Sequence, residues 1–258
     1  MVEGLIAALA LAAAAPVVQI QATDYALSMP ARIPAGLTTF AFENKGQEAH
    51  SLRFVRIGAG HSLAEFTAWQ KTADPIPAWL ESSGGLGTIA PGGTEELTAS
   101  LAAGAYIALC AYPTSDGATH LQKGMFAPVE VGPETSSGTP PQEDLTITLH
   151  DHGFQLTAPV GGGKSVWRVR NNGSEPHQAM LVRLPEGISE WQERAWLTGS
   201  GSTPREGVPS GGVLELAPDT DAWLSVNLAP GRYLLICAML EEEGRHFDLG
   251  MIYHFTVD

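Results

Sequence analysis

ENKGQEAHSLRFVRI, residues 43–57, recurs in altered form as RNNGSEPHQAMLVRL at residues 170–184. At an offset of 127 the two stretches share an Asn, a Gly, a Glu and a His in the same order, followed by a Val–Arg pair. The same offset aligns LAAGAYIALC (101–110) with LAPGRYLLIC (228–237), and an offset of 126 aligns HLQKGM (120–125) with HFDLGM (246–251). A repeat unit of this length is a domain rather than a solenoid module, so the sequence predicts two similar domains in tandem.

The domain boundaries follow from composition. GPETSSGTPPQE (132–143) is rich in Gly, Pro, Ser and Thr and has no apolar periodicity, which is typical of a linker. We therefore predict domain 1 over residues 16–131 and domain 2 over residues 144–258.

The N-terminal residues 1–15 are predicted to be a signal peptide. Their apolar run from Leu5 to Ala15 ends in small residues and is too short for a membrane span. Glu3, with no Lys or Arg before the run, argues for the alternative of a buried apolar strand or helix. The signal-peptide interpretation predicts a mature protein in the periplasm or outside the cell, with no integral membrane span.

Local patterns predict an all-β fold. Residues 38–46 and 164–173 alternate apolar and polar positions before an Asn/Gly turn, and residues 105–112 and 232–239 are apolar strands. Residues 125–131 and 251–257 are expected to be the last strand of each domain. Capping boxes at Ser62/Glu65 and Ser189/Gln192 predict one short helical insertion in each domain. Many short strands with few helices predict two tandem β-sandwich or barrel domains.

The charge balance limits the partners. The formal net charge is −14, with 28 acidic and 14 basic residues and no Lys/Arg cluster. Such a surface repels phosphate backbones, so we expect no nucleic-acid partner.

Each predicted domain carries the same ordered set of potential metal ligands, namely a His, a long gap, then Cys, His and Met. The two sets are His50, Cys110, His120 and Met125, and His177, Cys237, His246 and Met251. Two imidazoles, one thiolate and a weak axial thioether are the ligands of a blue-copper electron-transfer site. The alternatives are a small buried hydrophobe for each cysteine, a disulfide between the two, and a core position for each methionine.

The chain resembles the cupredoxins, the family of plastocyanin, azurin and the type 1 copper domains of larger enzymes. The first His follows an Asn/Gly turn in NKGQEAH and NNGSEPH, and the other ligands share one loop in CAYPTSDGATHLQKGM and CAMLEEEGRHFDLGM. The second loop has the ligand spacing of the type 1 site in copper nitrite reductases, and domain 1 has one extra residue before its histidine. The resemblance implies two Greek-key domains, each with one copper ion held by the four residues named above. We expect the glutamates 241–243 in the second loop to form a solvated face.

The resemblance implies a one-electron carrier between protein partners. Multicopper oxidases and copper nitrite reductases place a His directly before the cysteine, where this chain has Leu109 and Ile236. One His-x-His pair, His150 and His152, could chelate a second metal if both lay on a strand. The other hypotheses are a copper storage or delivery protein, a metal-free interaction module, and an oxidase or reductase using that pair. The sequence identifies no redox partner and no oligomeric state.

Overall fold

The computed structural model describes residues 13–72, 74–189, 192–193, 197 and 207–258. Nearly all regular structure in this part of the chain is β-strand, which confirms the predicted all-β class. The first half contains β1 (Val17–Thr23), β2 (Ala26–Ser28), β3 (Arg32–Asn44), β4 (His50–Ile57), α1 (Leu63–Trp69), β5 (Leu80–Ile89), β6 (Thr94–Leu101), β7 (Gly104–Leu109) and β8 (Phe126–Ser136). The second contains β9 (Leu145–His150), β10 (Gly153–Leu156), β11 (Gly163–Asn171), β12 (His177–Arg183), β13 (Val208–Leu216), β14 (Asp221–Leu228), β15 (Gly231–Ile236), β16 (Leu240–Glu241), β17 (Gly244–Arg245) and β18 (Ile252–Val257).

Each half is a β-sandwich. In the first half β1, β3 and β6 form one layer and β8, β7, β4 and β5 form the other, joined where β3 pairs in parallel with β8. In the second half β10, β9, β11 and β14 form one layer, and β13, β12, β15 and β18 form the other. Strands such as β1 bury alternate residues, so the apolar sides of the two layers face each other.

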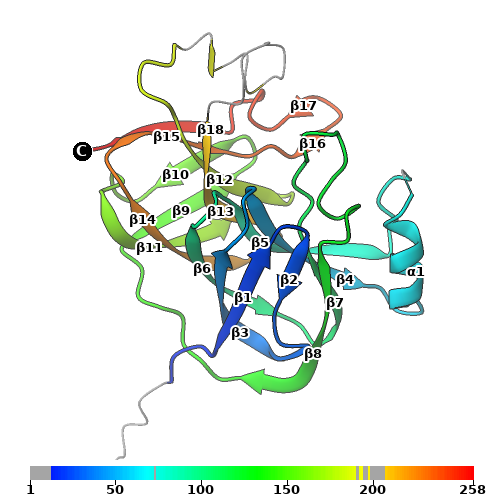
Figure 1. The fold of residues 1–258 in the computed structure, drawn as a ribbon. Helices are drawn as coiled ribbons and strands as arrows, with labels where there is room; N and C mark the ends of the chain where they lie inside the picture. The colour runs from blue at the N-terminus through cyan, green and yellow to red at the C-terminus, as the bar shows by residue number, and fades with distance from the viewer. Residues whose placement is uncertain (1–12, 73, 190–191, 194–196, 198–206) are drawn as a thin grey trace, which may run out of the picture.

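The two halves share both layers (Figure 1). Strand β5 pairs antiparallel with β13, and β6 pairs antiparallel with β14. Leu86 faces Val213 in the first pair and Leu97 faces Leu224 in the second, so each residue faces the one 127 positions along the chain. This is the arrangement of a local twofold axis between the halves.

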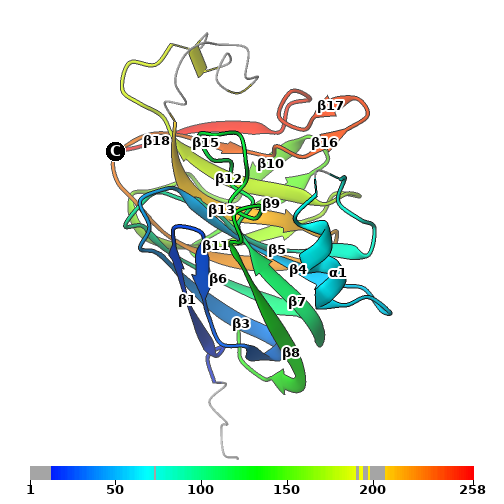
Figure 2. The same cartoon turned by 45° about the vertical axis from the view of Figure 1, so that its right-hand side comes forward.

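The helix predicted in the first half is present. Ser62 caps α1, and its side chain and that of Glu65 form the reciprocal capping box. The helix lies outside the sheets beside β4 and β7 (Figure 2), and its Phe66 belongs to a buried cluster that includes Ile57 and Ile107. The second predicted helix falls largely on residues outside the described part, although Ser189 and Gln192 do form the expected capping hydrogen bonds.

The remaining segment predictions are partly outside the described residues. Residues 1–12 of the predicted signal peptide are not described, and Ala14 bridges to Thr139. Strand β8 continues to Ser136 and pairs with β3, so the first residues of the predicted linker belong to the sheet. None of the helices in the described part of the chain is long and apolar enough to cross a membrane.

Candidate metal centres

The structure brings His50, Cys110 and His120 together in one fully buried cluster, which we call centre 1. His50 begins β4, Cys110 directly follows β7, and His120 lies in the loop between β7 and β8. The Nδ1 atoms of the two histidines are 2.9 Å apart. Cys110 Sγ lies 3.4 Å from His120 Nδ1 and 3.9 Å from His50 Nδ1. A point equidistant from three atoms at these separations lies about 2.0 Å from each, which is the length of a metal–imidazole bond.

The corresponding residues His177, Cys237 and His246 form centre 2 in the second half. The histidine Nδ1 atoms are 3.0 Å apart, and Cys237 Sγ lies 3.4 Å from His246 Nδ1. All three residues are buried. The arrangement repeats that of centre 1 although most of the surrounding loop residues differ.

Backbone hydrogen bonds fold each ligand loop back on itself. In centre 1, Cys110 N donates to Met125 O, and Met125 N donates to His120 O. In centre 2, Cys237 N donates to Met251 O and Met251 N to His246 O. Both methionines are fully buried, in the one core cluster that also contains both cysteines. The backbone of each methionine therefore lies beside its cysteine and its second histidine, and the methionine side chain stays a predicted ligand.

Asn44 and Asn171 hold the turn before the first histidine of each centre. The fully buried Asn44 amide donates to Glu48 O and Ile89 O and accepts from Gly46 N, and Asn171 makes the corresponding three hydrogen bonds in the second half. The turn passes so close to the centre that a Cβ on Gly46 would collide with Asp24 and lie 2.6 Å from His50 Nε2. Only glycine fits there, which explains the Asn-x-Gly pattern in both halves.

Carboxylates bind the outer nitrogens of three of the four histidines. Asp24 Oδ1 lies 3.3 Å from His50 Nε2, and Glu48 Oε2 lies 2.8 Å from His120 Nε2. In centre 2, Asp151 Oδ1 lies 3.0 Å from His177 Nε2. A carboxylate accepts only, so each of these Nε2 atoms carries the proton and each Nδ1 presents a lone pair to its centre. Carboxylates in this position orient imidazole ligands in many metal sites.

Burial sets the protonation of the ligands. It lowers the pKa of His50 and of His246, and in each pair the neighbouring histidine lowers it further. Burial also raises the pKa of the Cys110 and Cys237 thiols. The hydrogen bond from His177, with a second from Ser174, lowers the pKa of Asp151 to about 2. The shifts favour the neutral, metal-binding form of His50 and His246. Each thiol must release a proton when a metal binds.

The two sulfur atoms have different neighbours. Cys110 Sγ accepts a hydrogen bond from Ser51 N at 3.3 Å and lies 3.7 Å from Ser51 Oγ. Cys237 Sγ accepts from Gln178 N at 3.2 Å, and the side chain of Gln178 forms no hydrogen bond with it. Centre 1 therefore has one more potential donor to its thiolate than centre 2.

The structure does not assemble the His150/His152 pair into a metal site. Strand β9 ends at His150, and His152 lies in the following turn with a left-handed backbone (φ 64°), so the two are not successive residues on one face of a strand. His150 contacts Gln155, whereas His152 Nε2 lies 2.7 Å from Glu241 Oε1. Both cysteines are free thiols, so the disulfide alternative does not apply.

Sequence patterns did not assign the acidic neighbours of the histidines. Asp24 and Asp151 occupy equivalent positions in the repeat, as do Glu48 and Glu175. That equivalence was the one sequence feature that could have pointed to these residues as neighbours of the histidines. The prediction of a solvated glutamate run was wrong for Glu241, whose side chain is only 19% exposed and faces His152. Glu242 and Glu243 are exposed.

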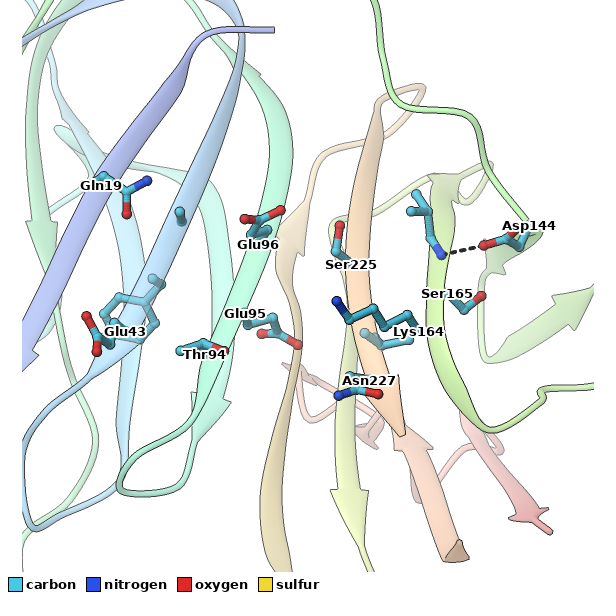
Figure 3. A pocket seen from close by; sticks show the side chains of 14 residues that line it. Gln19, Glu43, Thr94, Glu95, Glu96, Asp144, Lys164, Ser165, Ser225 and Asn227 are labelled. Atoms are coloured by element: carbon cyan, nitrogen blue, oxygen red, sulfur yellow. Dashed lines mark hydrogen bonds between the residues drawn. The ribbon is translucent and has the colours of Figure 1, made fainter. Parts of the chain in front are cut away.

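A cleft of about 670 Å³ lies where β6 of the first half meets β14 and β11 of the second. Figure 3 shows Glu43, Glu95 and Glu96 on one side of it and Lys164 and Asn227 on the other. None of the predicted metal ligands lines this cleft.

No protein-family model and no curated protein matches the chain. Among solved structures, the reduced auracyanin of Roseiflexus castenholzii is 23% identical, with 46% of this chain and 99% of that chain covered and a TM-score of 0.31. A Cu-containing nitrite reductase from Thermus scotoductus is 13% identical over 94% of this chain and 61% of that chain, with a TM-score of 0.27. A multicopper oxidase from Aquifex aeolicus is 13% identical over 95% and 66%, with a TM-score of 0.26. The conclusions on the two centres therefore come from the chain's own side-chain geometry.

That geometry agrees with the resemblance found in the sequence. The chain has an all-β, cupredoxin-like fold, and its His–Cys–His clusters match the type 1 copper ligand pattern.

Proposed function

We propose that the protein binds one type 1 copper ion in each half and carries single electrons between protein partners. The ligands are His50, Cys110, His120 and Met125 in centre 1, and His177, Cys237, His246 and Met251 in centre 2.

The main support for this proposal is the close approach of the two imidazole Nδ1 atoms in centre 1. Carboxylates hold the protons of His50 and His120 on Nε2, so two Nδ1 lone pairs face each other at 2.9 Å in a fully buried cluster. Two lone pairs at that distance repel unless a cation lies between them. The thiol sulfur 3.4 Å from one of these nitrogens supplies the third donor.

The donor set supports copper. Thiolate and thioether are soft ligands that favour Cu(I), whereas imidazole also suits Cu(II), so the mixed set serves both oxidation states. When bound, copper supplies the one-electron change. A zinc site would instead use four strong ligands of the Cys, His or carboxylate type, and the buried thioethers of Met125 and Met251 are not of that type.

The protein supplies a rigid frame that buries the ligands away from solvent. His50 and His177 are held by the Asn44 and Asn171 turns, and the other ligands by backbone hydrogen bonds within one loop. Ligands held this firmly move little when the charge at the centre changes, which lowers the reorganisation that opposes electron transfer. The cysteine sulfur is the ligand through which electronic coupling is expected to be strongest.

The cellular setting belongs to the same proposal. The apolar N-terminal run supports export to the periplasm or beyond the cell. A net charge of −14 favours redox partners with a cationic docking surface. Leu109 and Ile236, in place of the His that precedes the cysteine in the copper oxidases and nitrite reductases, support a carrier rather than an enzyme.

Metal stoichiometry and voltammetry together test this function. We expect two copper ions per chain, one in Cys110→Ser and one in Cys237→Ser, and a reversible one-electron response at a potential held by the protein. Rapid transfer of the copper to a chelator, with no reversible response, would contradict electron transfer and would favour copper delivery.

A further inference from the structure

A second set of ligand-type side chains surrounds the outer edge of centre 2. Carboxylate oxygens of Glu175 and Glu241 and the Nε2 atom of His246 all lie within 4.8 Å of one another. His152 joins this group, because its Nε2 lies 2.7 Å from Glu241 Oε1. That distance is also typical of two neighbouring ligand atoms on one metal ion, each about 2.0–2.2 Å from it.

The outer nitrogen of His246 is left without a hydrogen bond. The residue is only 2% exposed, and its Nε2 points at Glu175 Oε2 and Glu241 Oε1, each 3.8 Å away. Both distances exceed that of a hydrogen bond, and no other partner for this nitrogen occurs among the described residues. Glu175 and Glu241 thus converge on the outer edge of His246 without bonding to it, at separations that could hold a metal ion between their carboxylates.

In the first half, the polar groups at the equivalent position have partners within the chain. There Glu48 lies 2.8 Å from His120 Nε2 and accepts a hydrogen bond from the Tyr25 hydroxyl. Lys123 lies over the Tyr25 ring, 4.9 Å from its centre, and brings a positive charge to the edge of the group. Each polar group near the outer edge of centre 1 thus has a partner within the chain.

In the second half, residue replacements remove these partners. At the equivalent positions Tyr25 becomes His152 and Lys123 becomes Leu249, and Glu241 adds a second carboxylate. Only histidines pair with Glu175 and Glu241 in the described chain, so no Lys or Arg there neutralises them. Two neighbouring carboxylates and two imidazoles without a Lys or Arg partner form a group that an external cation stabilises.

We propose that Glu175, Glu241 and His152 bind a divalent first-row transition-metal ion, with the outer edge of His246 forming the inner side of the site. Imidazole and carboxylate together suit Zn²⁺, Ni²⁺ and Cu²⁺, and Cu²⁺ binds such sets most tightly. The site is open to solvent, since the side chains of Glu175 and His152 are 52% and 42% exposed. It lies one imidazole ring away from centre 2.

The test adds Cu²⁺ alone to the full chain after the two thiolate centres have been saturated. Electron paramagnetic resonance counts any further ion with nitrogen and oxygen ligands, and the titration gives its Kd. The variants are Glu241→Gln and His152→Tyr, which restores the residue type of the first half. His150→Ala is the control, because His150 is also an exposed histidine of the same turn region and its side chain bonds to Gln155 rather than to the two glutamates.

We expect one further Cu²⁺ per chain in the wild type and in the control, and a Kd at least tenfold higher in each of the other two variants. The inference would be overturned by a Kd in both variants equal to that of the control, or by no further ion in the wild type. An unchanged far-ultraviolet circular dichroism spectrum shows that a variant is folded. Absence of the thiolate absorption in every chain would refute the proposed function alone, because the comparison of Kd values does not depend on it.

Discussion

Ser51 is expected to raise the reduction potential of centre 1. Its hydroxyl lies 3.7 Å from Cys110 Sγ, in addition to the backbone N–H at 3.3 Å. A donor to this sulfur stabilises the reduced state more than the oxidised state, since Cu(II) withdraws electron density from the thiolate. Ser51→Ala removes the hydroxyl and keeps the backbone donor, so it should lower the potential of centre 1.

The size of the change follows from the contact. Hydrogen bonds to charged groups contribute about 1.5–3 kcal/mol. The long separation and the partial loss of charge in the oxidised state leave a difference between the states of about 0.5–1.5 kcal/mol. A tenfold change in a one-electron equilibrium is 59 mV, so the expected decrease is about 20–65 mV.

Spectroelectrochemical titration of the thiolate absorption measures this potential. Cys237→Ser serves as the background for Ser51→Ala, so that only centre 1 contributes. Gln178→Ala in a Cys110→Ser background is the matched control, because the Gln178 side chain forms no hydrogen bond with Cys237 and its removal should leave the potential of centre 2 unchanged. An unchanged or higher potential in the Ser51 variant would refute the reasoning.

Three further substitutions test the frame of the protein. Asn44→Ala removes three hydrogen bonds from a fully buried turn, so denaturant unfolding of the apoprotein should show a loss of about 2–4 kcal/mol; a loss within error of zero would contradict the role given to the turn. Gly46→Ala places a Cβ against Asp24 and His50 and should leave centre 1 without copper, as judged by metal content, whereas Gly153→Ala meets no atom within 4 Å and should retain it. Burial holds the pKa of Glu95 well above its usual value. The free energy of unfolding is therefore highest below the usual carboxyl pKa, where Glu95 is protonated, and it falls as the pH rises toward the raised pKa of the folded state. Glu95→Gln keeps the acceptor for Gly212 N, so its denaturant midpoint should match that of the wild type near pH 4 and exceed it at pH 7. The exposed Glu96→Gln should leave the midpoint unchanged at both pH values. Equal midpoints of Glu95→Gln and wild type at both pH values would show that the buried carboxyl imposes no cost.

The sequence predicted much of this molecule because the chain contains two copies of one pattern. Matching His, Cys, His and Met positions in the two copies indicated which residues would come together, and period-two alternation indicated the strands. The Asn-x-Gly turn was recognised as a turn. Its further role, to let the backbone pass against Asp24 and His50, depends on distances that only the folded chain provides.

Other features depend on contacts between distant segments. The continuation of both layers from one half into the other rests on the pairs β5–β13 and β6–β14, and edge pairing of this kind leaves no local signature in a strand. Glu241 belongs to an acidic run that composition alone assigns to solvent. It is held inward by His152, a residue 89 positions away in the sequence.

Whether the buried cysteines bind copper as thiolates is best tested by the visible spectrum of the protein reconstituted with Cu(II). Converging His and Cys ligands predict an intense thiolate-to-copper absorption. It should persist in Cys110→Ser and in Cys237→Ser, each with one centre intact, and disappear in the double variant. A wild-type protein that shows no such absorption and retains no copper after gel filtration would contradict the account.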